Sequence, residues 1–158
     1  MEVQIENLPQ KKLVGKRMRM SRSDDRTVAL FRGFKPHLGL IEGKLNATIW
    51  CLQVYEGALN SNVDVYFDKW AAVEVNDAAT LPPEMEKFTI PEGLYAVILL
   101  QGIHTEALKT LVDFYQNWLS QSPYILDDRP HFQIMGEKYH PLSPDSEEEA
   151  WIPIRLKF

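Results

Sequence analysis

The sequence predicts an α+β fold made of two strand-helix-strand-strand modules related by a pseudo-two-fold axis, with an antiparallel sheet and two main helices. Two observations favour this fold. Segments of strand, helix, strand and strand occur twice in the same order. A few letters also recur, because Gln53 and Trp70 in the first half correspond to Gln133 and Trp151 in the second, at nearly the same interval. A fold with such an axis leaves a cleft where the modules meet, and clefts are where small ligands bind.

Length and composition limit the class of protein. A chain of 158 residues fits one domain, 1–158, with module one at about 1–80 and module two at about 81–158. The net charge of -5 argues against non-specific nucleic-acid binding. Cys51 is the only cysteine, so no internal disulfide is expected. With no apolar signal core at the start and no stretch that resembles a membrane span, we expect a cytoplasmic protein.

Two strands and a helix are expected to open the first module. The strands are Val3–Leu8 and Lys11–Met20, the second of which alternates charged side chains with methionine. A helix should follow, with Ser21 as its N-cap and Pro36 at its end, because proline lacks the backbone donor that a helix needs. From His37 the chain should continue as a loop.

A hairpin is expected to complete the first module. Residues 47–55 alternate as a strand, with Gln53 and Tyr55 on the face opposite Trp50. A polar turn at 60–64 should lead into a second strand at 66–75 that pairs back on the first.

The stretch 69–102 joins the two modules. Leu81-Pro82-Pro83 breaks any regular element, since two prolines remove two backbone donors. Residues 88–90 resume a strand, and Pro91-Glu92-Gly93 makes a turn. Residues 94–100 form a continuous apolar run with the length of a buried strand.

The second module holds the clearest helix, 105–120, with Thr105 as its N-cap and apolar residues at helical spacing. A charged loop at 126–130 and a short strand at 132–135 should follow. A polar excursion at 140–149 is then expected, with three consecutive glutamates in a solvated loop. Residues 151–158 alternate and should close the chain as a strand.

Motifs for metal, phosphate or nucleophilic chemistry are missing from the sequence. Its histidines lie far apart, and no second cysteine is present, so we expect no metal site and no cofactor. Cys51 lies inside an apolar strand, where a buried structural thiol is expected. No catalytic residue is predicted.

The aromatic residues are more informative. Most are expected in the core, but Tyr55 and Trp70 share predicted strand faces with Gln53 and Glu74. A polar group beside aromatic walls is the usual composition of a cleft for a flat organic molecule. Gln133 lies in a comparable setting beside Phe132, with a hydrogen-bonded place in the sheet as the alternative.

The motifs KWAAVEV, FTIPEGLYAVILLQG, NWLSQSPYILDDRPHFQIMGEKY and SEEEAWIPI, in this order, resemble the GyrI-like small-molecule-binding domain. This is the effector-binding domain of AraC-type and MerR-type bacterial transcription activators. The resemblance implies two modules related by a pseudo-dyad, with drug-like and often cationic aromatic molecules bound between them. It also implies a buried glutamate where this sequence has Gln133. An amide offers only neutral hydrogen bonds, so a strong preference for cations is not expected here.

We therefore expect a stand-alone binding protein for small aromatic molecules, which acts as a sensor or sequestering protein. The predicted ligand-binding residues are Tyr55, Trp70, Tyr95, Trp118, Gln133 and Trp151. The expected partners are a small organic ligand and possibly a regulator or topoisomerase, with no direct DNA binding and no membrane.

Two alternatives from other functional classes stay open. One is a hydrolase of reactive small molecules, with Glu137 or Glu74 as the base and Tyr95 assisting. The other is a protein-interaction module of the gyrase-inhibitor kind, in which the acidic surface would matter and the cleft could be empty.

Overall fold

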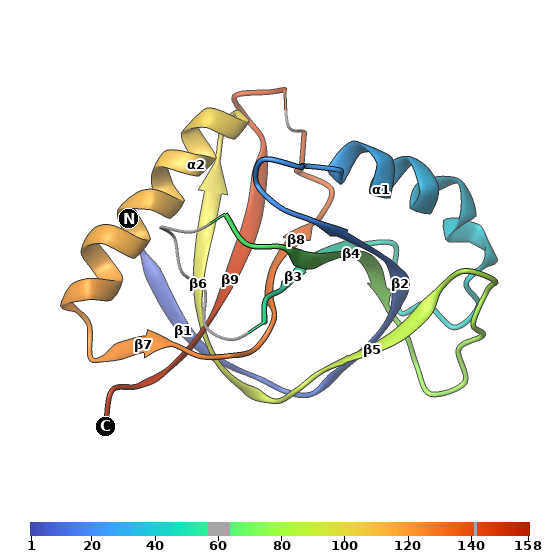
Figure 1. The fold of residues 1–158 in the computed structure, drawn as a ribbon, viewed down its shortest axis with the longest axis horizontal. Helices are drawn as coiled ribbons and strands as arrows, with labels where there is room; N and C mark the ends of the chain where they lie inside the picture. The colour runs from blue at the N-terminus through green and yellow to red at the C-terminus, as the bar shows by residue number, and fades with distance from the viewer. Residues whose placement is uncertain (57–63, 141) are drawn as a thin grey trace.

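A nine-stranded sheet and two α-helices dominate the computed structural model, which describes residues 1–56, 64–140 and 142–158 (Figure 1). The helices are α1 (Thr27–Phe34) and α2 (His104–Asp113), extended by a 3₁₀-helix, η1 (Lys35–Leu40), and a π-helical turn, η2 (Phe114–Leu119). The strands are β1 (Val3–Leu8), β2 (Lys11–Met20), β3 (Ile49–Val54), β4 (Phe67–Glu74), β5 (Glu86–Ile90), β6 (Gly93–Gln101), β7 (Tyr124–Leu126), β8 (His131–Met135) and β9 (Glu147–Leu156).

The order of the strands in the sheet reflects the two modules. The sheet runs β1-β6-β9-β8-β3-β4-β2-β5, with β7 paired to β9, and the strand pairs are antiparallel. From the outside inward, β6-β9-β8 in one half corresponds to β2-β4-β3 in the other, so β8 and β3 meet at the centre. Each half also receives an edge strand from the other part of the chain, since β1 pairs with β6 and β5 with β2. The predicted α+β fold is confirmed.

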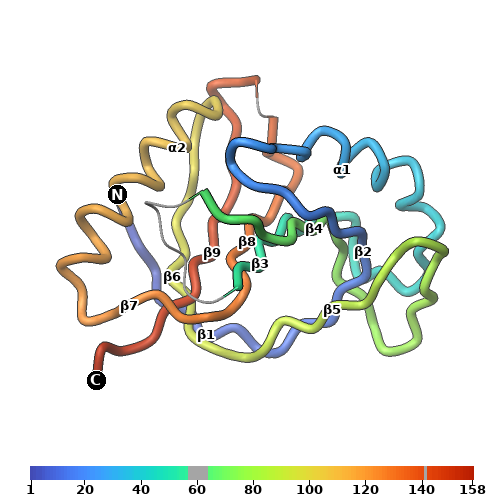
Figure 2. The backbone as a smooth tube through the Cα atoms, in the orientation of Figure 1, coloured from blue at the N-terminus to red at the C-terminus, as the bar shows by residue number. Residues whose placement is uncertain are grey.

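The two faces of the sheet carry separate cores. Both helices lie on one side, where α1 packs Leu30 and Phe34 against β2 and β4, and α2 packs Ala107 against β6 and β9 (Figure 1). The other face holds an aromatic cluster drawn from β1 to β6, β8 and β9. Strands at both ends of the sheet reach this one cluster because the sheet is strongly curved, as the backbone trace shows (Figure 2).

The start of α1 differs from the prediction. The helix begins at Thr27, and Arg26 stands at its N-cap position without a side-chain capping bond. Ser21 is therefore not the cap, because its Oγ accepts the backbone N–H of Asp24 at 3.1 Å in a turn before the helix. After α1, the chain tightens into η1 around Pro36, so the loop expected from His37 is instead helical.

The second module also departs from the prediction in places. α2 begins at His104 with Ile103 at the N-cap position, so Thr105 does not cap it. The short strand β7 was missed, and Glu147–Glu149 belong to β9 rather than to a solvated loop. Pairing with Leu99 and its neighbours on β6 supplies the backbone hydrogen bonds that hold these glutamates in a strand. Most of the polar turn predicted at 60–64 lies outside the described residues.

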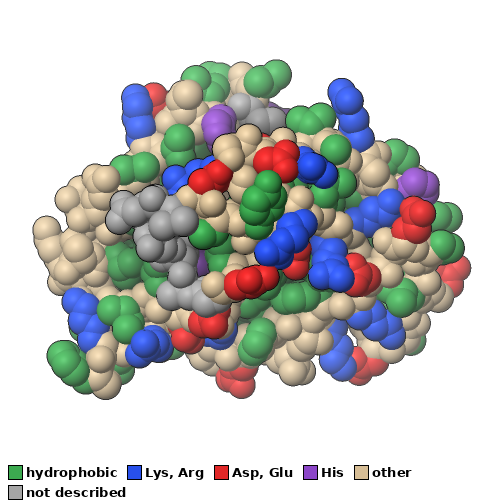
Figure 3. Space-filling view, viewed as in Figure 1, with side chains coloured by type: hydrophobic (Ala, Val, Ile, Leu, Met, Phe, Trp, Pro, Cys, Tyr) green, Lys and Arg blue, Asp and Glu red, His purple; other side chains and the backbone are tan. Residues whose placement is uncertain are grey.

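Charged side chains on the surface are interspersed rather than segregated by sign. On the face seen in Figure 3, basic and acidic groups lie next to one another. On β2, Arg17 pairs with Asp68 and Glu86, and Lys11 pairs with Glu74. In the part of the chain that the structure describes, no helix is long and apolar enough to cross a membrane.

Candidate ligand-binding cleft

The central strands β3 and β8 carry a cavity of about 470 Å³ on the helix side of the sheet. Residues of β3, β4, β8, β9 and α2 line it, so it draws on both halves of the chain. Alternation along each strand turns every second side chain toward the helices. The polar groups that this arrangement brings together include Gln53, Tyr55, Lys69, Tyr115, His131 and Gln133.

Two glutamines form the floor of this cleft. Nε2 of Gln53 donates a hydrogen bond of 3.0 Å to Oε1 of Gln133, and these residues correspond to each other in the two halves. Among the described residues, Oε1 of Gln53 and Nε2 of Gln133 have no other protein partner within hydrogen-bonding distance. The floor therefore offers a ligand one acceptor and one donor, both neutral.

A histidine and two tyrosines close one end of the cleft. His131 is 6% exposed, and burial lowers its pKa to about 4, with the positive charge of Arg129 acting in the same direction. The hydroxyl of Tyr115, which the π-helical turn η2 carries, lies 3.5 Å from Nδ1 of His131, and Tyr55 packs edge-on against the imidazole. Burial raises the pKa of both tyrosines, so all three groups are neutral at pH 7.

Charged groups lie beside these neutral ones. Nζ of Lys69 donates a 2.9 Å hydrogen bond to Oγ1 of Thr27, which in turn donates to Oδ1 of Asp25. That hydrogen bond lowers the pKa of Asp25. Glu148 is half-buried on β9, on the same strand face as Ala150, and burial raises the pKa of its carboxyl while Lys69 acts against this shift. The cleft lining thus carries the carboxylate of Asp25 and the cationic side chains of Lys69 and Arg22, with Glu148 two positions from the lining residue Ala150.

Cys51 lies on the same face of β3, but it is not suited to nucleophilic chemistry. The side chain is 1% exposed, and burial raises the pKa of its thiol to about 11. A thiol with so little thiolate at pH 7 is a structural group.

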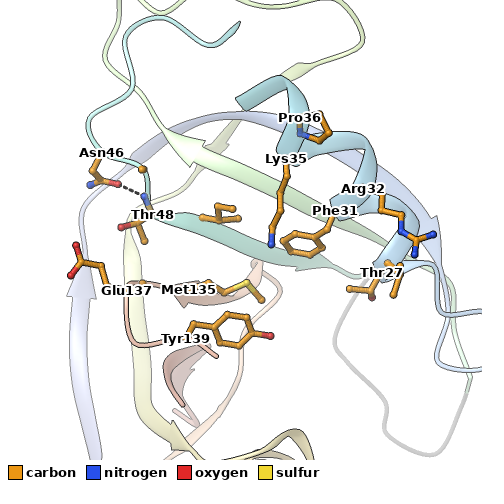
Figure 4. Close-up of a pocket in the computed structure, with 14 residues that line it drawn as sticks. Thr27, Phe31, Arg32, Lys35, Pro36, Asn46, Thr48, Met135, Glu137 and Tyr139 are labelled. Carbon is orange, nitrogen blue, oxygen red and sulfur yellow. Dashed lines mark hydrogen bonds between the residues drawn. The ribbon is translucent and has the colours of Figure 1, made fainter. Parts of the chain in front are cut away.

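A second, larger cavity of about 890 Å³ lies beside α1, at the other end of β3 and β8 (Figure 4). Phe31, Ile49, Met135 and Tyr139 contribute to its walls, and Lys35 reaches over it from the start of η1. Its lining and that of the cleft have no residue in common.

Two of the six predicted ligand-binding residues, Tyr55 and Gln133, have side chains on the cleft side of the sheet. Trp151 borders the cavity, but its ring packs on Phe132 and Tyr95 in the aromatic core of the opposite face. Trp70 and Tyr95 lie instead in the aromatic core on the opposite face, where Trp70 is 5% exposed and the hydroxyl of Tyr95 donates to the carbonyl of Pro130 at 2.8 Å. Trp70 is opposite Leu52 in the β3–β4 pair, so it cannot share a face with Gln53.

Trp118 also lies outside both cavities. It stacks on Phe114 and Tyr124 in the core beneath the end of the second helix. Of the acids considered as catalytic bases, Glu74 is ion-paired with Lys11 at 3.3 Å, and Glu137 is exposed at the second cavity.

Sequence reasoning missed His131 and Lys69 as cleft residues, and it missed Glu148, which lies two positions before the lining residue Ala150 on β9. A signal for Glu148 was present, since the alternation of Ile154, Ile152 and Ala150 extends backward to it. Alternation on β8 likewise places His131 on the face of Gln133, but its contacts with Tyr55 and Tyr115 are not visible in the sequence. Within residues 1–56, 64–140 and 142–158, no group of three or more His, Cys, Asp or Glu side chains could hold a metal ion.

Comparisons with known proteins agree with this architecture. The family model described as GyrI-like small molecule binding domain matches residues 1–155. Among curated proteins, none matches the chain significantly.

Three solved structures share the fold at low sequence identity. SAV2435 bound to tetraphenylphosphonium has a TM-score of 0.71 at 18% identity, covering 98% of this chain and 94% of that one. The C-terminal domain of EcmrR has a TM-score of 0.70 at 14% identity, covering 98% of each chain. A hydrolase from Listeria innocua has a TM-score of 0.63 at 11% identity, covering 98% of this chain and 92% of that one.

Proposed function

The chain belongs to the GyrI-like small-molecule-binding domain family, and from this membership we propose that it binds a small aromatic molecule in the cleft over β3 and β8, beside α2. The observation that carries the proposal is the Gln53–Gln133 pair, which leaves one acceptor and one donor available at the bottom of a cavity with aromatic and apolar walls. A few convergent polar groups in an otherwise apolar cavity are typical of ligand sites.

Each group in the cleft has a role in this proposal. Leu108 and Val112 on α2 are 51% and 43% exposed, and they would cover one side of a flat ligand. Tyr55 would stack or pack edge-on against it, as aromatic side chains do. The amides of Gln53 and Gln133 would orient it by hydrogen bonds.

The charges in the cleft allow cationic ligands without requiring them. Asp25 in the lining and Glu148 beside it would attract a cation, but the positive charges of Lys69 and Arg22 reduce that attraction. Gln133 contributes no charge. We therefore propose that neutral aromatic molecules and aromatic cations both bind. The preference for the cation should be smaller than a single, unopposed carboxylate would give. SAV2435, which shares the fold, binds tetraphenylphosphonium.

We propose further that binding serves a sensor or sequestering role in the cytoplasm, with any regulator supplied by another protein. Family membership supports this role, and so does the shared fold with the C-terminal domain of EcmrR.

Hydrolysis is the second candidate. Glu148 is half-buried, and burial raises the pKa of its carboxyl, the direction of change that favours a general acid. Burial and the charge of Glu148 both raise the pKa of Tyr139. A structural relative from Listeria innocua is a hydrolase. Recovery of a bound compound unchanged after long incubation would exclude hydrolysis of that compound, whereas loss of the compound that stops in a Glu148→Gln variant would favour it.

A thermal-shift titration tests the binding proposal, because a ligand of the native state raises the melting temperature. Tetraphenylphosphonium and the neutral triphenylphosphine oxide serve as probes. Val112→Trp fills the cleft from an exposed position, and Val28→Trp, 65% exposed, fills the second cavity as the matched control. We expect Val112→Trp to abolish the shift and Val28→Trp to keep it. No shift with either probe, or loss of the shift in Val28→Trp alone, would contradict the proposal.

A further inference from the structure

The cavity beside α1 has no role in the proposed function, because none of its lining residues lines the cleft. Its volume of about 890 Å³ can hold a ring system with substituents. Phe31 and Tyr139 present aromatic rings to it, and Ile49 and Met135 supply aliphatic surface from β3 and β8 (Figure 4). These walls suit a flat apolar body.

Lys35 gives this cavity a charge of its own. Its Nζ lies 5.7 Å from the centre of the Phe31 ring, and Figure 4 shows it projecting into the cavity while the carboxylate of Glu137 points away. Among the described residues, no carboxylate lies within ion-pair distance of Lys35. All five lysines and arginines of β2, in contrast, are ion-paired. The lining therefore carries two basic side chains, Lys35 and Arg32, and one exposed carboxylate, Glu137, which is not ion-paired with Lys35.

Polar groups around the opening add neutral hydrogen-bonding capacity. The backbone N–H of Thr48 is already used by Oδ1 of Asn46 at 3.0 Å, which fixes that corner of the rim. Tyr139 is half-buried, and burial raises the pKa of its hydroxyl, so the group stays protonated and can donate a hydrogen bond. The rim thus supplies a donor in addition to the ammonium group.

We infer that this cavity is a second binding site that prefers an aromatic anion, such as a carboxylate or sulfonate on a fused or linked ring system, over the neutral ring system. The ring body lies against Phe31, Met135 and Tyr139, and the anionic group meets Nζ of Lys35. An aromatic cation is disfavoured here because it would meet the like charge of Lys35. The charge preference is thus the reverse of the one that Glu148 gives the cleft.

Fluorescence titration with two dyes tests this site. 8-Anilinonaphthalene-1-sulfonate carries the anion, and N-phenyl-1-naphthylamine has the same rings without it. We expect Lys35→Gln to weaken sulfonate binding about two- to fivefold, the range for a partly exposed charge pair, and to leave the neutral dye unchanged. Lys87→Gln removes an exposed charge on β5 and should change neither.

The two tryptophan variants locate the dye. Val28→Trp should weaken the binding of both dyes, and Val112→Trp should weaken the binding of neither. Tetraphenylphosphonium should not displace the sulfonate dye. If Val112→Trp removes sulfonate binding, the dye occupies the cleft and the inference is wrong. It is equally wrong if neither tryptophan variant has an effect, or if Lys35→Gln and Lys87→Gln act alike. A different result would contradict the proposed function, namely no shift in melting temperature with tetraphenylphosphonium or triphenylphosphine oxide.

Discussion

His131→Phe should flatten the acid dependence of stability. The imidazole is 6% exposed, and burial lowers its pKa from the ordinary 6.5 to about 4. An imidazole that titrates lower in the folded chain resists protonation there, while the unfolded chain takes up the proton readily. Stability therefore falls as the pH drops below the unfolded value, and the loss is complete only below the folded value. Phenylalanine keeps an aromatic ring against Tyr55 and cannot be protonated.

The magnitude follows from these two pKa values. At pH 5 the unfolded imidazole is almost fully protonated, whereas the folded one, with its pKa at about 4, is mostly neutral. The difference corresponds to about 1.5 pH units at about 1.4 kcal/mol each, so the wild-type free energy of unfolding should fall by about 2 kcal/mol between pH 7 and pH 5 through this one group.

Urea unfolding at pH 7, 6 and 5 measures this effect. The free energy of unfolding of His131→Phe minus that of the wild type should rise by about 2 kcal/mol over that interval. Tyr115→Phe is the matched control, because it removes the hydroxyl contact with Nδ1 and leaves the imidazole in place. Its pH dependence should run parallel to the wild type. Parallel curves for His131→Phe would refute the reasoning and would show that the imidazole takes up its proton without opening the fold.

Three further substitutions test the cleft and the sheet. Gln133→Glu should raise the affinity for tetraphenylphosphonium relative to triphenylphosphine oxide by about 1 kcal/mol, measured by calorimetry, and equal ratios in both proteins would place residue 133 outside the ligand contact. Glu148→Gln should raise the melting temperature at pH 7, because burial raises the pKa of Glu148 and so disfavours its charged form in the folded protein. The gain should disappear in acid, where the carboxyl is protonated in both the folded and the unfolded protein. Gly15→Ala should cost about 3 kcal/mol or more in urea unfolding, since its Cβ would lie 2.1 Å from the carbonyl oxygen of Ala71, and Gly39→Ala, with open space around it, should cost far less.

The strands could be predicted well from the sequence because alternation and proline placement are local signals. β1 and β2 have the predicted bounds, and Leu81-Pro82-Pro83 does separate β4 from β5. The missed parts depend on partners distant in the chain. Glu147–Glu149 carry three charges and look like a loop, yet pairing with β6 makes them a strand. The start of α1 was misjudged because Ser21, an excellent cap by type, uses its hydroxyl in a preceding turn.

The site was harder to predict than the fold, for a reason that Trp70 and Gln53 make clear. Each lies on a correctly predicted strand, and the register decides whether a side chain faces the helices or the aromatic core. Trp70 pairs with Leu52, and both side chains face the aromatic core. Its neighbour Lys69 pairs with Gln53, and both of these face the cleft. Which aromatic residues face the cleft therefore depends on how β3 pairs with β4 and with β8. The pattern of a single strand does not contain that information.

The aromatic core and the proposed cleft lie on opposite faces of the sheet. Trp70, Tyr95 and Phe132 build the core on the concave face, so truncating them should unfold the protein before it reveals anything about a ligand. Gln53 and Gln133 lie on the other face at the junction of the two halves, where their mutual hydrogen bond leaves polar groups available. A residue can change there at little cost to the core behind it. The same fold can therefore accept either a glutamine or a carboxylate at position 133, so the fold alone does not fix the charge of the ligand.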